Sequence, residues 1–262
     1  MGTTKRHRLS VLIPCYNEER AIEDCLRSVD WADEILVVDS FSTDATLEIA
    51  RRYTDRVLQH EYIYSAAQKN WAIPQASHEW VLIVDSDERV TPGLRDEIMA
   101  LLEGEPAFDG YWIPRRNYLF GREIRHCGWG ADTVLRLFKR DKGRYSDKRV
   151  HAEVAISPAG RLANHLEHHT ISSVSDWIAK INKYSSWKAM DKHEKGMVLP
   201  VAHLVFRPPA RFIKDFVIRL GFLDGWRGFL IAALSSFAEL VMAAKVVEKR
   251  ASGSFRSRVQ GP

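Results

Sequence analysis

The sequence predicts an α/β protein: a mostly parallel sheet flanked by helices and followed by a helical C-terminal segment. Apolar segments rich in β-branched residues alternate with segments of helical periodicity through residue 104. Polar residues gather directly after the apolar segments, which is where parallel sheets bind ligands. Residues 203–262 carry ten basic and four acidic side chains among many large apolar ones, so this part differs in kind from the rest.

Four strands are expected in the first part of the chain, each a short apolar run closed by polar or turn residues. They lie within SVLIPCYNEE (10–19), DEILVVDSFSTDA (33–45), VLQHEY (57–62) and WVLIV (80–84). The segments that follow them have helical spacing, as in 19–29, where Ile22, Leu26 and Val29 form one stripe. The other helices are expected at 45–53, 65–76 and 92–104.

After residue 104 the pattern changes. Segments 110–122, 133–140 and 149–156 are β-rich and separated by Gly and charged turns, so we expect antiparallel strands or loops over the ligand-binding edge. Residues 173–196 return to helical spacing. We therefore divide the chain into a first domain, 1–170, and a C-terminal helical segment, 171–262.

The C-terminal segment has the composition of a membrane-surface element. The apolar run 229–244 is interrupted by Ser235, Ser236 and Glu239, and it is shorter than the roughly 20 residues of a spanning helix. We expect an amphipathic segment that lies on an anionic membrane surface. The cations that would face the lipid are Arg207, Arg211, Lys214, Arg219 and Arg227. The alternative is a pair of helices packed on the body of the protein.

Composition excludes several classes of protein. With 45% hydrophobic and 27% charged residues the chain can bury a core. Its formal charge of +4 is too small to indicate a nucleic-acid partner. Cys15, Cys25 and Cys127 form no CxxC pair, which favours reduced thiols. The first apolar run is too short for a secretory signal, so we expect a cytoplasmic protein at the inner face of the membrane.

Three carboxylates, Asp85, Asp87 and Glu88, follow the strand 80–84. In a turn, Asp85 and Asp87 can converge on one cation, and hard carboxylate oxygens suit Mg²⁺ or Mn²⁺. Alternatively they form a solvated turn, and Glu88 is expected to be a solvated neighbour. Two other polar strand ends, 16–18 and Asp39 with Asp44, are expected at the same edge of the sheet, which favours a functional site.

Four motifs taken together resemble family 2 of the inverting glycosyltransferases, which has the GT-A fold. They are IPCYNEE (13–19), VVDSFSTDAT (37–46), the pair Lys69-Asn70, and VDSDE (84–88). Segments 128–140, 144–154 and 221–232 resemble the lipopolysaccharide-core type, similar to β-1,4-glucosyltransferases. The resemblance implies a metal-dependent transferase that moves a hexose from a nucleotide sugar such as UDP-glucose to a lipopolysaccharide-core or other envelope glycan.

The resemblance also implies roles for individual residues. Those placed around the nucleotide sugar are Pro14, Tyr16, Asn17, Glu18, Asp39, Lys69 and Asp85. Asp39 would accept a hydrogen bond from the base, and Lys69 would lie near the base or the phosphates. Asp87 would be the main metal ligand, helped by Asp85 and by His151.

Two residues are candidates for the catalytic base. Asp132 falls where the family has a Glu-Asp pair, although Ala131 replaces the Glu. Glu153 is displaced by one position from the family's Val-His-Glu, which in a strand moves it to the other face. Inversion by a single displacement needs one base to take the acceptor's hydroxyl proton and a cation to stabilise the leaving diphosphate.

Other functions fit parts of the same pattern. DSDERVT (85–91) is similar to the motif of aspartyl phosphatases, and a nucleotidyltransferase also binds a metal-bound nucleotide. A non-catalytic membrane-surface binding protein is the remaining alternative. The run HLEHH (165–169) is interpreted as surface or packing rather than as a metal cluster.

Overall fold

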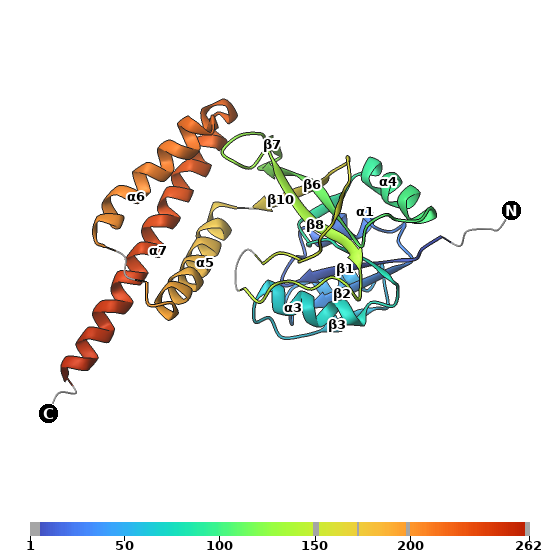
Figure 1. Ribbon diagram of the computed structural model, residues 1–262, viewed down its shortest axis with the longest axis horizontal. Helices are drawn as coiled ribbons and strands as arrows, with labels where there is room; N and C mark the ends of the chain where they lie inside the picture. The colour runs from blue at the N-terminus through green and yellow to red at the C-terminus, as the bar shows by residue number, and fades with distance from the viewer. Residues whose placement is uncertain (1–5, 149–151, 172, 198–199, 260–262) are drawn as a thin grey trace. The chain divides into compact units, whose positions relative to one another are not determined.

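The computed structural model describes residues 6–148, 152–171, 173–197 and 200–259 (Figure 1). The chain divides into two compact units, and each is described by itself. Unit 1 comprises residues 1–118 and 131–170, and unit 2 comprises residues 119–130 and 171–262. The segment 119–130, which the sequence assigned to the first domain, therefore clusters with the C-terminal helices.

Unit 1 is built on a mixed sheet with the strand order β3-β2-β1-β4-β8-β6-β10-β5. The strands on this path are β1 (Leu9–Cys15), β2 (Glu34–Asp39), β3 (Val57–Gln59), β4 (Trp80–Ile83), β5 (Glu88–Val90), β6 (Gly110–Leu119), β8 (Asp132–Lys139) and β10 (Leu166–Ile171). The first four are parallel, whereas β8 is antiparallel to both β4 and β6. Strand β9 (Gly160–Arg161) also pairs with β6, whose last residue, Leu119, belongs to unit 2 together with its partner strand β7 (Arg122–Ile124). The α/β class is confirmed, and the antiparallel half makes the sheet mixed.

Helices cover both faces of this sheet because alternate residues of each strand are apolar on both sides. Val11 and Ile13 of β1 pack on one face with α1 (Ile22–Ser28) and α4 (Pro92–Glu103), whereas Leu12 packs on the other face with α3 (Ser65–Ala72) (Figure 1). Two shorter helices complete the connections, α2 (Thr46–Ala50) and the 3₁₀ turn η1 (Ile73–Gln75). The buried strands place their carboxyl ends at one polar edge.

Several expected elements differ in extent from the observed ones. The helix expected at 45–53 is observed only as α2. Of the β-rich segment 149–156, residues 149–151 lie outside the described part, and Val154 forms an isolated bridge with Tyr145. Strand β10 was not expected at all, because its sequence LEHHTI alternates weakly and is rich in polar residues.

Glu34, at the start of β2, is held by hydrogen bonds from three side chains. It accepts from Ser10 Oγ at 2.5 Å, Ser77 Oγ at 2.7 Å and Arg56 Nε at 3.0 Å. Burial alone would raise the pKa of Glu34, but these hydrogen bonds outweigh it and lower the pKa below its ordinary 4.5. A lowered folded-state pKa means that the ionised group stabilises the fold above the unfolded pKa, and that this stability is lost as the pH falls through the folded pKa.

We therefore expect Glu34→Gln to lower the free energy of unfolding by about 1 to 3 kcal/mol at neutral pH. The difference from the unaltered protein should shrink below about pH 4.5. Urea unfolding over a series of pH values measures both quantities, with the exposed Glu103→Gln as control. A difference that stays constant down to about pH 3 would contradict this assignment.

Unit 2 is helical. Its elements are α5 (Val174–Glu194), α6 (Ala202–Ile213), the π-helical turn η2 (Lys214–Ile218), the 3₁₀ turn η3 (Gly221–Asp224) and α7 (Trp226–Val259). Helix α7 packs against both α5 and α6. The core of unit 2 includes Leu119 and Ile124 from the 119–130 segment together with Trp177, Ile181 and Ile231.

Candidate functional site

The polar edge of unit 1 begins where β1, β2 and β3 end. The strand register places Cys15, Asp39 and Gln59 side by side. Asp39 is fully buried and accepts hydrogen bonds from the Ser42 backbone N at 3.0 Å and from Gln59 Nε2 at 3.1 Å. The carboxylate expected to face a base is thus already held by its own chain in this structure.

The first predicted motif, residues 13–19, is hydrogen-bonded to the loop that follows Asp39. The Asn17 backbone N donates to Ser42 Oγ at 2.8 Å, and Asn17 Oδ1 accepts from the Thr43 backbone N at 2.8 Å. Asn17 has a positive φ of 52°, a conformation that Asn tolerates better than most residues. Tyr16 remains 53% exposed, so its ring is accessible to a stacking ligand. Pro14 pairs in register with Val38, and the Glu18 backbone N donates to Thr46 Oγ1.

Strand β10 brings a histidine to the DSDE turn. β5 pairs antiparallel with β10, with His168 directly opposite Glu88. The His168 Nε2 atom lies 3.4 Å from Asp87 Oδ2, and the backbone N of His169 donates to the Asp87 carbonyl. Within HLEHH, His168 is therefore packed against the DSDE turn, a specific contact that the interpretation as surface or packing did not include. Its partner strand lies too far along the chain for local periodicity to reveal the pairing.

Asp132 is fixed by a cross-strand partner on β6. It lies directly opposite Arg115 in the β6–β8 register. Arg115 donates to Asp132 Oδ2 from Nε at 2.7 Å and approaches it from Nη2 at 2.6 Å, and Asn117 Nδ2 donates to the same oxygen at 3.3 Å. None of these donors contacts the second oxygen, Oδ1. Asn117 Oδ1 in turn lies 2.7 Å from His168 Nδ1, which links Asp132 to Asp87.

Glu88 is a buried bridge between two arginines. Its side chain is fully buried, with Oε1 at 2.9 Å from Arg115 Nη1 and at 3.4 Å from Arg136 Nη2. Its Oε2 accepts from the Asp85 backbone N at 3.0 Å. The expectation of a solvated Glu88 is wrong, because two strand arginines need a buried counter-charge. In the sequence, Arg136 stands between Leu135 and Leu137 in an apolar strand, which indicates a buried cation but not which carboxylate pairs with it.

Asp85 is held between cations. Its carboxylate contacts Lys69 Nζ at 2.7 Å and also pairs with Arg136. Burial alone would raise the pKa of Asp85, but the charges of Arg136 and Lys69 hold it well below its usual range. Burial would likewise lower the pKa of Arg136, and the charges of Asp85 and Glu88 raise it instead. Asp85 and Arg136 therefore both stay ionised at neutral pH.

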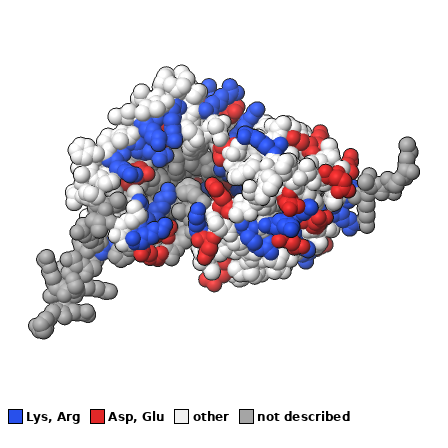
Figure 2. Space-filling view, in the orientation of Figure 1, with Lys and Arg blue, Asp and Glu red and all other residues white. Residues whose placement is uncertain are grey.

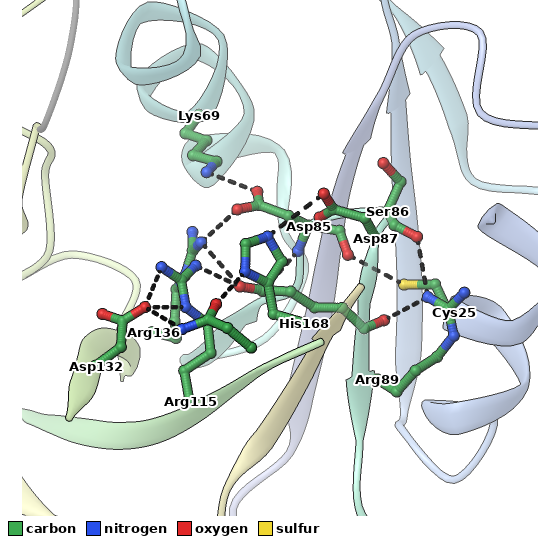
Figure 3. Close-up of polar contacts among 12 residues, drawn as sticks. Cys25, Lys69, Asp85, Ser86, Asp87, Arg89, Arg115, Asp132, Arg136 and His168 are labelled. Atoms are coloured by element: carbon green, nitrogen blue, oxygen red, sulfur yellow. Dashed lines mark hydrogen bonds and ion pairs between the residues drawn. The ribbon is translucent and has the colours of Figure 1, made fainter. Parts of the chain in front are cut away.

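These contacts join eight residues in an open ring at the sheet edge, whose two ends, Asp85 and Asp87, are separated in the chain only by Ser86 (Figure 3). In order, its members are Asp85, Arg136, Glu88, Arg115, Asp132, Asn117, His168 and Asp87. Figure 3 shows side chains from separate elements converging on this edge, with Lys69 reaching in from α3. With Lys69, three cations face four carboxylates, so the assembly carries one net negative charge when His168 is neutral.

Two members of the ring, Asp87 and His168, are of residue types that bind divalent cations. No group of three His, Cys, Asp or Glu side chains that could hold a metal occurs among the described residues. Asp87 and His168 nevertheless place an oxygen and a nitrogen 3.4 Å apart. Mg²⁺ and Mn²⁺ sites in nucleotide enzymes commonly use one or two protein ligands and take the rest from phosphates and water. The pair therefore fits a cation that arrives with a diphosphate.

Of the two remaining predicted site residues, His151 lies outside the described residues. Glu153 is exposed, and its backbone carbonyl and N–H bind Ser146. Five ring members had not been predicted as site residues, since each acquires its role from a strand pairing: Glu88, Arg115, Asn117, Arg136 and His168.

Comparison with known proteins gives consistent matches. The family described as Glycosyl transferase family 2 matches residues 10–157. A lipopolysaccharide core biosynthesis glycosyltransferase of Rhizobium meliloti, LpsC, is 34% identical over 263 residues and covers 93% of each chain. An uncharacterized glycosyltransferase of Rickettsia typhi is 27% identical and covers 92% of this chain and 87% of its own.

Two solved structures are similar at low identity. Staphylococcus aureus TarS 1–349 shares 17% identity with a TM-score of 0.45 and covers 94% of this chain and 92% of its own. Glucosyl-3-phosphoglycerate synthase from Mycobacterium tuberculosis, in complex with Mn²⁺, UDP and glucosyl-3-phosphoglycerate, shares 16% identity with a TM-score of 0.47. It covers 74% of this chain and 81% of its own.

Proposed function

Because this chain belongs to glycosyl transferase family 2 and is therefore a glycosyltransferase, we propose that it moves a hexose from a nucleotide sugar to a lipopolysaccharide-core acceptor. The similarity to LpsC along nearly the whole chain supports the acceptor class. UDP-glucose is the donor we would test first. Family membership favours glycosyl transfer over the phosphatase, nucleotidyltransferase and non-catalytic alternatives.

The observation that carries the mechanism is the link Asp132–Asn117–His168–Asp87. It connects the proposed base with the proposed metal ligand at the carboxyl edge of the sheet. Asp132 takes the proton of the acceptor hydroxyl as the glycosidic bond forms, and the anomeric centre inverts in this single displacement. Arg115 holds one carboxylate oxygen of Asp132, which orients the other towards the acceptor.

We assign the donor side to the carboxyl ends of β1, β2 and β4. The nucleotide pocket is lined by Pro14, Tyr16, Asn17 and Glu18. Asp39 accepts a hydrogen bond from the base once its hydrogen bond with Ser42 is broken. Lys69 and Asp85 form a preorganised pair beside the sugar and phosphates.

Asp87 with His168 would hold Mg²⁺ or Mn²⁺, and such a cation stabilises charge on the leaving diphosphate. His168 takes the role that the sequence assigned to His151. Unit 1 binds the donor, and unit 2 places the enzyme at the cytoplasmic face of an anionic membrane, where glycolipid acceptors lie.

The metal assignment gives a direct test. We expect His168→Ala to weaken Mn²⁺-dependent binding of UDP by about 10- to 100-fold, and Asp87→Ala to do the same or more. Isothermal titration of UDP with Mn²⁺ and with EDTA measures this without any acceptor. The matched control is His169→Ala, because the His169 ring stacks on Tyr118 instead. Unchanged Mn²⁺-dependent binding by His168→Ala would contradict the assignment.

A further inference from the structure

We propose that residues 205–229 of unit 2 form an interfacial surface that docks on an anionic lipid bilayer without crossing it. This inference rests on the membrane partner of the proposed function and names the element that enters the headgroup region. The surface is formed by α6, η2, η3 and the first turn of α7. It contains ten large apolar side chains whose exposed fractions run from 45% to 71%. The most exposed are Val205, Phe206, Ile218, Leu223 and Trp226.

Charge on the interfacial surface is one-sided because its acidic groups are buried. Asp215 is fully buried between Arg211 Nε at 2.5 Å and Arg219 Nη1 at 3.0 Å. Asp224 is turned inwards, where it contacts His126 Nδ1 at 3.1 Å and accepts from its backbone N. Arg207, Lys214 and Arg219 are exposed, whereas Arg211 and Arg227 are half-buried. Figure 2 shows blue Lys and Arg side chains among white ones on this part of the surface. A surface that exposes cations among apolar side chains is complementary to anionic headgroups.

The backbone makes this surface a fixed feature of the fold. The chain reverses direction at 219–225, where Leu220 and Gly225 have positive φ angles of 57° and 62°. The centroid of the Phe216 ring lies 6.3 Å from that of Phe222 and 5.8 Å from that of Phe229. These ring contacts pack the segment before the reversal against the segment after it. The exposed apolar side chains around Phe222 are therefore held in a defined conformation.

Helix α7 is long and apolar enough over Trp226–Lys249 to cross a membrane by length and composition. Its neighbours argue against a crossing. Lys245 Nζ binds Asn182, Ser185 and Ser186 of α5, and Glu239 lies 3.9 Å from Arg211. A crossing would carry these polar groups into hydrocarbon, where they are costly. Docking on a bilayer surface leaves these polar groups in water and buries only the exposed apolar side chains of the interfacial surface.

Vesicle sedimentation tests the proposal on the full-length protein. The vesicles are phosphatidylcholine with about 30% phosphatidylglycerol, or phosphatidylcholine alone, and no sugar nucleotide is present. We expect binding to the anionic vesicles only, release by high salt and by alkaline carbonate, and about tenfold or greater loss with the double variant Phe222→Asp, Leu223→Asp. Ile178→Asp on α5 is the matched control and should bind normally, because Ile178 is 45% exposed, against 48% for Phe222 and 55% for Leu223.

A second variant guards against a folding defect. Lys214 is exposed at the surface, and Lys214→Glu should weaken anionic-vesicle binding by about tenfold or more while circular dichroism is unchanged. Full binding by both variants, or resistance of the unaltered protein to carbonate, would overturn the proposal. So would a change from dimer to monomer in the variants without loss of vesicle binding, because a second copy would then be the occupant. Since no donor or acceptor is used, a failed glycosyltransferase assignment would leave these results unaffected.

Discussion

Asp132→Asn will lower kcat by about 10²- to 10⁴-fold, while binding of the nucleotide sugar changes little. The substitution keeps the shape of the side chain and its contacts with Arg115 and Asn117. It removes the oxygen that can take a proton from the acceptor, and general-base catalysis typically contributes this much. Release of UDP from UDP-glucose, with truncated lipopolysaccharide core as acceptor, gives the rate, and titration with UDP gives the affinity.

Glu153→Gln is the control for this experiment, because Glu153 was the second candidate for the base. Its side chain is exposed, and the contacts found for it are made by its backbone. We expect its rate to stay within about twofold of the unaltered enzyme. The assignment would be reversed if Glu153→Gln lost activity and Asp132→Asn kept it.

Glu88→Gln will lower the free energy of unfolding by about 3 to 5 kcal/mol, the loss expected when one partner of a buried ion pair is removed. The carboxylate is fully buried between Arg115 and Arg136, and an amide leaves two guanidinium groups under-compensated. Urea unfolding measures the change. The matched control is Glu48→Gln, which breaks an exposed pair with Arg52 and should cost less than about 1 kcal/mol.

A second substitution separates charge from packing. In the double variant Glu88→Gln, Arg115→Met, one uncompensated cation is gone, so part of the lost stability should return. Purely additive losses in the double variant, or a loss below about 1 kcal/mol in Glu88→Gln alone, would show that Glu88 is not the counter-charge of these arginines.

The parallel half of the fold could be predicted from the sequence because its information is local. Each of the first four strands is a short apolar run, and the residue pattern around Val11, Leu12 and Ile13 already requires two covered faces. The antiparallel half could not be placed in the same way. Strand β10 contains Glu167, His168 and His169, and only its pairing with β5 makes an extended conformation favourable there.

The residues of the candidate site also differ in whether local sequence or a distant strand pairing determines their role. Asp39, Asp85 and Asp87 stand at strand ends, so position and residue type together pointed to them, whereas Asp132, at the start of β8, was identified through the family resemblance. Glu88 could not be recognised as buried, because its burial depends on two arginines that reach it from β6 and β8. Single-strand periodicity carries no information about which charged residue of another strand lies opposite.

The pairing of β5 with β10 also has a consequence for the order of folding. The two strands are separated by all of the chain between Val90 and Leu166. Their pairing is therefore expected to form later and more slowly during folding than the local β–α units. During synthesis, the parallel half can assemble while Asp87 still lacks His168. We expect the β5–β10 edge, where the proposed catalytic residues lie, to be the last part of unit 1 to acquire protection from hydrogen exchange during refolding, after the parallel strands β1, β2 and β4.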